Sequence, residues 1–278
     1  VTNEDRVWAQ KLLAQEQALR AETARNTVGV LYFKNGTGRP DLDPLQKGIA
    51  LMLITDLSQV KSLQVVERAQ LQALVEEMGL GKSGLVDPAT APRVGKLLGS
   101  RWLIGGDFIR GKVEELRIGS EVLEVAAGKT VAQPFSEGKL QDLFSMEKNL
   151  LFDVVKALNV EPTAEEQDRM RVPCSTSPRA LMSLFKGVDA SDRGDYARAA
   201  EFYRAAVKDD PKICIAGGAL EELQGMGLIG GKKKSEDLLR SLRHDTSFND
   251  QLTPKEAERR EKTPKDVTTP ARIGVVFP

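Results

Sequence analysis

Residues 28–66 have the sequence VGVLYFKNGTGRPDLDPLQKGIALMLITDLSQVKSLQVV, in which a strand, a helix and a second strand follow one another. Residues 28–33 form a short run rich in β-branched and aromatic side chains, and Asn35-Gly36 ends it with a turn signal. Asp43 is placed to cap the helix, Pro44 takes its first position, and apolar residues then recur every four positions from Leu45. This order predicts a sheet covered by helices.

The same alternation continues on both sides of this stretch. Before it, residues 3–26 predict a helix that lies on a surface or on a neighbouring subunit, because their apolar stripe is narrow. After it we expect helices at 67–78, 87–98 and 139–158, and strands at 101–108, 113–125 and 129–135. Ala126-Ala127-Gly128 makes the last two strands an antiparallel hairpin. The predicted fold class is α/β (α+β), a small mixed sheet packed with helices and followed by a helical module.

The second half of the chain divides differently. Residues 159–178 contain Pro162 and Pro173 and few apolar residues, so we expect a linker. The predicted division is an N-terminal helix at 1–26, an α/β domain at 27–158, this linker, a helical module at 179–230 and a charged, extended arm at 231–278. The arm ends in a strand-like segment at 271–277, which is suited to pairing with a sheet edge.

Composition excludes several classes of function. Among 278 residues, 40 are Lys or Arg and 40 are Asp or Glu, so the basic surplus that nucleic-acid binding requires is missing. One His and two distant Cys provide no zinc-ligand spacing. No apolar run reaches the roughly 18 residues of a membrane helix. Because the chain begins at Val1, we expect a mature chain from which a leader was removed.

Residues 28–158 resemble the CsgG-type curli-assembly family, which is related to the N-terminal domain of TolB. The likeness depends on the first strand with Asn35, a helix ending ITDLS, the segment VVER, the turn GLVDPATA and the helix end GKLLG. The positions that match the family are Asn35, Asp56, Glu67, Arg68, Asp87 and Pro88. We interpret Asp56, Glu67 and Arg68 as capping and ion-pair residues at the helix–strand junction.

The resemblance implies a bacterial envelope protein, in the periplasm and associated with the outer membrane, that acts by assembly with protein partners and as a homo-oligomer. Two features depart from the family. The hairpins between Arg101 and Phe135 are too short and too charged for a transmembrane barrel, and no Cys at the start of the chain carries a lipid. We therefore do not expect a pore. Any association with the membrane would depend on a partner or on a lipid anchor that was removed.

Residues 180–211 resemble a tetratricopeptide repeat. The signature positions are Gly187, Gly194, Tyr196, Ala199, Tyr203, Ala206 and Pro211, with small residues at the helix crossing and a Pro closing the second helix. A single repeat cannot bury both of its faces, so residues 212–228 are expected to form a capping helix. The resemblance implies a surface that binds proteins or peptides.

The remaining chemical motifs favour no enzyme. Gly79-Leu80-Gly81-Lys82-Ser83-Gly84 follows a helix, whereas a phosphate loop follows a strand. His244 has no nucleophile or orienting group near it in the sequence, and Lys232–Lys234 is typical of a solvated surface. The pairs Glu76-Glu77 and Glu114-Glu115 diverge and are interpreted as solvated. We expect no catalytic residue, no cofactor and no metal site.

Cys174 and Cys214 leave two alternatives open. Cys174 precedes the first helix of the repeat, Cys214 begins the helical segment that follows it, and stacked repeats bring such helix starts together. In an oxidising periplasm they would form a disulfide, and otherwise they are two buried thiols.

The sequence thus favours a non-enzymatic envelope scaffold or assembly protein that binds partners of a secretion, fibre or surface-appendage system. Three alternatives stay open: a ring or channel component of a curli-like exporter, a cytoplasmic TolB-like regulator with tetratricopeptide repeats, and a nucleotide sensor. The last alternative depends on the Gly-rich segment alone.

Overall fold

The computed structural model describes residues 3–16, 26–80, 86–87, 89–112 and 114–229. Several sequence predictions concern residues outside these ranges. They are the Gly-rich segment beyond Leu80, Pro88, Lys232–Lys234, His244 and the C-terminal arm with its terminal strand.

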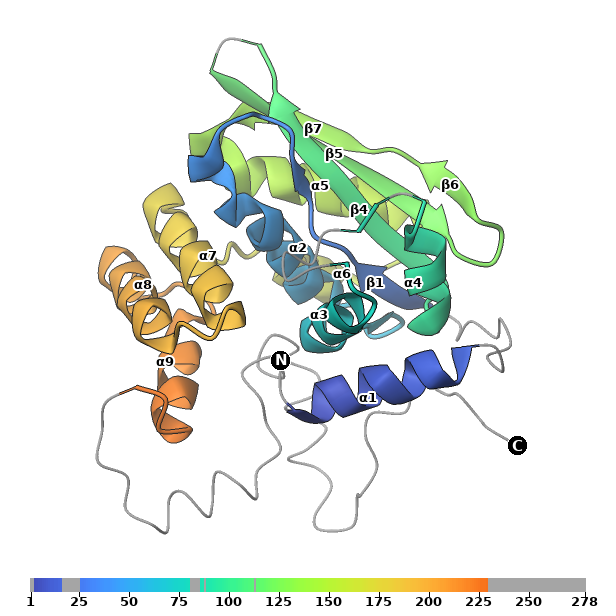
Figure 1. Cartoon of the computed structure of the whole chain (residues 1–278). Coiled ribbons are helices and arrows are strands. Elements are labelled where there is room, and N and C mark those ends of the chain that lie inside the picture. Colours follow the sequence, from blue (N-terminus) through green and yellow to red (C-terminus); the bar gives the residue numbers. More distant parts are fainter. Residues whose placement is uncertain (1–2, 17–25, 81–85, 88, 113, 230–278) are drawn as a thin grey trace.

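One mixed sheet forms the centre of the α/β domain (Figure 1). Its strands are β1 (Thr27–Val30), β2 (Lys34–Asn35), β3 (Gln64–Val65), β4 (Trp102–Arg110), β5 (Glu115–Glu124), β6 (Lys129–Ala132) and β7 (Phe135–Lys139). The order is β3-β1-β4-β5-β6, with β2 beside β4 and β7 beside β5. Strands β1, β2, β3 and β4 are parallel where they pair, and the β4–β5, β5–β6 and β5–β7 pairs are antiparallel. The expected fold class, a mixed sheet packed with helices, is confirmed.

The two faces of the sheet are covered by different helices. On one face, α2 (Pro44–Leu57) and α5 (Leu143–Ala157) pack on strand residues such as Ile104, Phe108 and Ile118. On the other face, α3 (Arg68–Glu77) and α4 (Ala91–Leu97) pack on Leu31 and Leu103. The short helices η2 (Pro40–Leu42) and η3 (Leu140–Asp142) lead into α2 and α5. Burial of these aliphatic side chains provides the core of the domain.

Helix α1 (Asn3–Ala14) lies along α3 (Figure 1). Its side chains Ala9 and Leu12 are buried in the same cluster as Leu71 and Leu74 of α3. Arg6 lies 2.8 Å from the carboxylate of Glu76. Of the two positions expected for this helix, the structure therefore shows the one on the surface of its own domain.

Up to residue 229, where the description ends, four helices follow the α/β domain: α6 (Ala164–Met170), α7 (Pro178–Asp192), α8 (Tyr196–Asp209) and α9 (Ala216–Gly225). Figure 1 shows α7, α8 and α9 together on one side of the molecule, with α7 beside α2. We call α7, α8 and α9 the helical module. Its core is continuous with the cluster under the sheet, because Leu184 and Phe185 belong to the same buried set as Ile49 and Leu53 of α2.

Two expected elements differ in the structure. The strand expected at 129–135 is two strands, β6 and β7, which pair with different parts of β5. Pro134 separates them, and its carbonyl oxygen accepts a hydrogen bond from the Ser120 N–H. A proline cannot donate to a sheet ladder, which explains the break.

The segment at 159–178 is also more ordered than a linker. It contains α6, which begins with a capping box in which Thr163 and Glu166 satisfy each other's backbone N–H groups. Glu166 also accepts a hydrogen bond from the Lys61 N–H at 2.8 Å, which fixes α6 to the end of α2. No helix in the described part of the chain is long and apolar enough to cross a membrane.

Candidate functional site

The helical module is attached to the α/β domain along α2. Gly48 lies so close to the ring of Phe185 in α7 that a Cβ atom at this position would overlap the ring. Close approach of this kind requires glycine, because any side chain would push the helices apart. The contact between α2 and α7 is therefore tightly packed.

Beside this contact, a buried charge network joins three elements. Arg68, the first residue of α3, donates two hydrogen bonds to Asp192 at the end of α7, at 2.7 and 2.9 Å. It also donates to the hydroxyl of Tyr32 at 2.8 Å. The ammonium of Lys47 in α2 lies 2.9 Å from Asp192 and 3.1 Å from Asp189. We call these five residues the junction network.

The pKa shifts in the network agree with this pairing. Burial acts to raise the pKa of Asp192, but Arg68 and Lys47 outweigh it and lower this pKa to about 2. Burial acts to lower the pKa of Arg68, and the charge of Asp192 outweighs it in the opposite direction. Burial raises the pKa of Tyr32. Asp192 and Arg68 are therefore charged at neutral pH, because the charge of each stabilises the charged form of the other.

Arg68 pairs with a residue outside the helix–strand junction, which the sequence did not predict. Glu67 and Arg68 were expected to hold the helix–strand junction. Glu67 does occupy the N-cap position of α3, yet its side chain makes no capping hydrogen bond. Arg68 instead pairs across 124 positions with the helical module. Lys47 and Asp192 were missed, because no local pattern marks ion pairs between distant segments.

Next to the junction lies a cavity of about 310 Å³. It is bounded by α2, α5, α7, the segment that joins α6 to α7, and the residues just before α9. Its apolar lining comprises Leu51, Met52, Phe144, Val172, Pro173, Leu184, Phe185, Ile215 and the half-cystines 174 and 214. Its polar lining comprises Thr55, Asp56, Gln59, Glu147, Lys148, Arg169 and Ser175. We call it the interhelix cavity.

Two carboxylates and one ammonium meet in the wall of this cavity. Lys148 of α5 forms an ion pair with Asp56 of α2, and its Nζ lies 3.3 Å from Oε2 of Glu147. The side chains of Asp56 and Lys148 are 10% and 11% exposed, and that of Glu147 is 1% exposed. Burial and then the nearby Asp56 raise the pKa of Glu147 well above its usual value. Burial also raises the pKa of Asp56, and Lys148 opposes that shift.

Asp56 was singled out in the sequence, but its partners were not. It was expected to act as a capping or ion-pair residue at a helix–strand junction. In the structure it lies in the last turn of α2, and its ion pair runs to α5. Glu147 and Lys148 lie in a helix with ordinary amphipathic spacing, which gave no signal that they face a cavity.

A disulfide forms another part of the cavity wall. Cys174 and Cys214 are bonded, and the Cys214 N–H donates to the Cys174 carbonyl oxygen at 2.9 Å. Ile215, the next residue, has a φ of 68°. A β-branched residue in this region of φ is an outlier that the surrounding structure must hold in place.

The positions of the repeat signature lie in and around α7 and α8. A Cβ atom at Gly187 of α7 would overlap the ring of Tyr203 in α8, so the crossing of these two helices depends on glycine. The other signature residues are Gly194 in the turn, Tyr196 at the start of α8, Ala199 and Ala206 on the buried face of α8, and Pro211 after it. The assignment as a tetratricopeptide repeat stays a prediction, and α9 takes the place expected for the capping helix.

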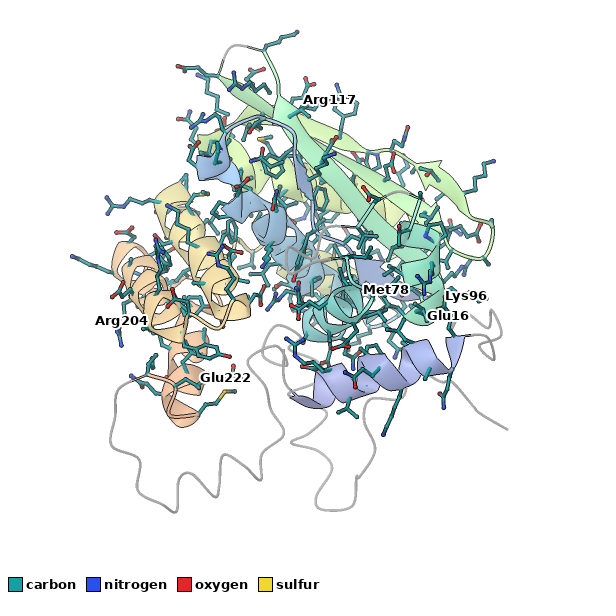
Figure 2. All side chains as sticks on the ribbon, viewed as in Figure 1. Glu16, Met78, Lys96, Arg117, Arg204 and Glu222 are labelled. Atoms are coloured by element: carbon teal, nitrogen blue, oxygen red, sulfur yellow. A yellow bond between two sulfur atoms is a disulfide. The ribbon has the colours of Figure 1, made fainter. Side chains whose placement is uncertain are left out.

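Among the described elements, no helix covers one part of the sheet. On β4 and β7, Ile109 is 38% exposed and Phe135 is 48% exposed. Ile109 pairs with Arg117 of β5, which pairs in turn with Glu137 of β7. The guanidinium of Arg117 stacks on Phe135 with its carbon 3.7 Å from the ring centre. We call Ile109, Arg117, Phe135 and Glu137 the open sheet face. Figure 2 shows Arg117 at the opposite end of the molecule from Arg204 and Glu222 of the helical module.

Other residues singled out in the sequence have local structural roles. The side-chain amide of Asn35 donates to Asp43 at 2.7 Å, which ties the end of β2 to the start of α2. The carbonyl oxygen of Asp87 accepts from the Thr90 N–H ahead of α4.

The two Glu pairs differ in burial, because Glu76 is mostly buried and Glu114 is exposed. Glu76 is mostly buried against Arg6, whereas a solvated position was expected. Glu114, at a φ of 58°, lies in the β4–β5 turn. In the part of the chain that the structure describes, no three His, Cys, Asp or Glu residues are grouped to hold a metal.

Comparison with known proteins supports a CsgG-type domain. The family model described as "Curli production assembly/transport component CsgG" matches residues 9–133. This range begins within α1 and ends before β7, so it covers the sheet up to β6 and excludes the helical module.

A curated protein and two solved structures are also similar. The chain is 28% identical over 168 residues to "Putative adenylate cyclase 3" of Rhizobium meliloti, which is 60% of this chain and 27% of that protein. The chain thus spans about a quarter of this relative. The C-terminal domain of LpoB from Escherichia coli is 16% identical with a TM-score of 0.34 and covers 48% of this chain and 94% of its own. The same domain from Salmonella enterica is 16% identical with a TM-score of 0.32 and covers 47% and 95%. TM-scores this low establish no shared fold.

Proposed function

We propose that this chain is a non-enzymatic scaffold of the bacterial cell envelope that binds a protein partner through its open sheet face. The family match supports a role in assembly, because the matched model describes an assembly and transport component. The disulfide supports an oxidising compartment such as the periplasm, where such bonds persist. We place the protein there, associated with the outer membrane through its partner or through an anchor, and acting as a homo-oligomer.

The observation that carries this proposal is the uncovered half of one sheet face. Helices α3 and α4 cover Leu31 and Leu103, but Ile109, further along β4 on the same face, is exposed. Aromatic side chains and Arg are the residue types that most often anchor protein interfaces. Phe135 and Arg117 meet this description, and their stacking holds both in place.

Site-specific photo-crosslinking tests the proposal. A photoreactive phenylalanine analogue would replace Phe135 in one variant and Arg204 of α8 in the other, expressed in the cells that naturally make the protein. Arg204 is an exposed control far from the open sheet face (Figure 2). We expect a discrete adduct in the envelope fraction from position 135 and none from position 204. Adducts of equal yield from both positions, or a protein absent from the envelope fraction, would exclude the proposal.

A second candidate function is a regulatory segment of a larger signalling protein. It is favoured by the 168-residue similarity to a putative adenylate cyclase, of which this chain spans about a quarter. In the cytoplasm, thiols are kept reduced. Alkylation of freshly lysed cells followed by mass spectrometry separates the two candidates: a bonded Cys174–Cys214 pair supports the envelope scaffold, and two alkylated thiols support the cytoplasmic regulator.

A further inference from the structure

We propose that the interhelix cavity binds a small organic cation, an amine carried on an apolar body, with Asp56 and Glu147 receiving the ammonium group. This inference does not depend on the proposed scaffold function. Most of the residues that line this cavity lie beyond residue 133, outside the range of the family match.

The shape and lining of the cavity fit a small molecule. Its volume of about 310 Å³ lies at the lower end of the range of roughly 300–1,000 Å³ that is usual for ligand pockets. Most of the lining is apolar, with Leu51, Phe144 and Phe185 among the larger side chains. Such pockets place a few polar groups to orient the ligand. Here those groups are the carboxylates and the ammonium of the cluster at Asp56.

The charges in the wall specify the sign of the ligand. Asp56 and Glu147 would carry two negative charges when ionised, and Lys148 supplies one positive charge to both. A buried charge without compensation is costly, so a proton on one of the two carboxylates takes the place of a second cation. Burial and Asp56 raise the pKa of Glu147, and this direction favours Glu147 as the carboxylate that holds the proton. A bound ammonium group would compensate the second carboxylate and release the proton.

Among the lining residues that the structure describes, no other charge alters this balance. The remaining charged lining residue is Arg169 of α6, and it is already paired with Glu165 at 2.7 Å. Helix α7 contributes Leu184 and Phe185 to the cavity, and neither can titrate. Phe144 adds an aromatic face near the cluster, since Nζ of Lys148 lies 5.4 Å from its ring centre. Aromatic faces attract cations, which favours the same ligand class.

The experiment uses the wild-type chain and three matched probes. Calorimetry would compare 2-phenylethylamine with its neutral analogue 2-phenylethanol and with the anion 3-phenylpropanoate at pH 7.5. We expect the amine to bind with a Kd of about 1 mM or tighter and the alcohol to bind at least about tenfold more weakly. Repeating the amine titration in buffers of different ionisation enthalpy should show proton release. Equal binding of alcohol and amine, preference for the anion, or no amine binding at 10-fold higher concentration, about 10 mM, would overturn the proposal.

A pair of variants locates the binding. Glu147→Gln keeps the shape of the side chain and removes the carboxylate, and we expect at least about a tenfold loss of amine affinity with no proton release. Glu201→Gln, at an exposed position of α8 that does not line the cavity, should bind as the wild type does. If Glu147→Gln bound the amine as tightly as the wild type, the proposed site would be wrong. The comparison of probes on the wild type decides the question even if this variant proves unstable.

A final measurement distinguishes two possible ligands, a free amine and a lysine side chain of a partner protein. N-acetyl-lysine methylamide carries the same ammonium group on a peptide-like backbone. Binding of 2-phenylethylamine at least about tenfold tighter than this compound supports a small-molecule ligand. The opposite preference would overturn that assignment and indicate a protein side chain.

Discussion

At the scale of single residues, Asp192 is the group on which attachment of the helical module depends. It is the shared partner of Arg68 and Lys47, and all three side chains are at most 5% exposed. Replacing Asp192 by Asn would remove the carboxylate that Arg68 and Lys47 share, and Lys47 would keep only its ion pair with Asp189. We expect Asp192→Asn to lower the free energy of unfolding by about 3–5 kcal/mol, measured by urea denaturation at pH 7. Glu165→Gln, in an exposed ion pair, should cost far less.

The difference in free energy of unfolding between the wild type and Asp192→Asn should become smaller at acidic pH. The folded-state pKa of Asp192, about 2, is below its usual value of 3.8, so its contribution is fully present above pH 4. That contribution is lost as the pH falls from 4 towards 2. The stabilities of the wild type and of Asp192→Asn should therefore converge in this window. A constant difference between pH 6 and pH 3 would contradict the assignment.

Glu147 should show the opposite pH dependence. Its folded-state pKa is raised, so the protonated side chain contributes stability below pH 4.5, and this is lost as the pH rises through the folded-state pKa. Glu147→Gln mimics the protonated state and does not titrate. We expect the variant to gain stability relative to the wild type as the pH rises above 4.5, measured by urea denaturation in steps up to pH 9. A difference independent of pH would show that Glu147 is ionised throughout.

Sequence reasoning identified some of these residues but none of their partnerships. Asp56 and Arg68 were marked by the family resemblance, whereas Lys47, Lys148, Glu147 and Asp192 were not. The reason is geometric, because Arg68 and Asp192 are 124 positions apart and meet only when α7 packs on α2. A charged residue on an amphipathic helix looks the same in sequence whether it faces solvent or a distant counter-ion.

At the scale of elements, the crossing of α7 and α8 can be tested with two glycines. A methyl group at Gly187 would overlap the ring of Tyr203, whereas one at Gly217 in α9 would meet nothing within 4 Å. We expect Gly187→Ala to destabilise the protein by about 1–3 kcal/mol, because overpacking forces the helices apart. Gly217→Ala should stabilise it by about 0.5–1 kcal/mol, since alanine is the better helix former. Thermal and urea denaturation measure both changes.

The disulfide links the start of α7 to the start of α9. It closes a loop with a sequence separation of 40 residues, for which the chain-entropy model gives about 3–4 kcal/mol. We expect the Cys174→Ser, Cys214→Ser double variant to lose about this much stability and to unfold at a lower urea concentration. The same loss in the wild type under reducing conditions would confirm the cause. If the oxidised wild type and the double variant were equally stable, the disulfide would contribute nothing to the stability of the protein.

Most elements were predictable because their signals are local. The helix after Asp43-Pro44 and the long strands β4 and β5 follow from capping and apolar spacing. The division of β6 from β7 was missed because FSEGK, the sequence of β7, has little strand character and forms by pairing with β5. Helix α6 was missed although Thr163 and Glu166 spell a capping box, since two prolines nearby suggested a linker.

At the scale of the whole molecule, two parts with different roles share one core. The α/β domain carries the family match and the open sheet face, and the helical module closes the cavity against α2 and α5. The boundaries of the predicted domains stay a prediction.

We propose that the open sheet face binds the protein partners that keep this chain in an envelope assembly. The most direct measurement is the native mass of the protein extracted from the envelope in mild detergent, compared for the wild type, Phe135→Glu and the control Arg204→Glu. Phe135 is about half exposed, so its replacement should leave the fold intact. We predict that the wild type and the Arg204 variant migrate as a larger assembly and that Phe135→Glu migrates with the mass of a single chain. The same mass for all three proteins would contradict the account.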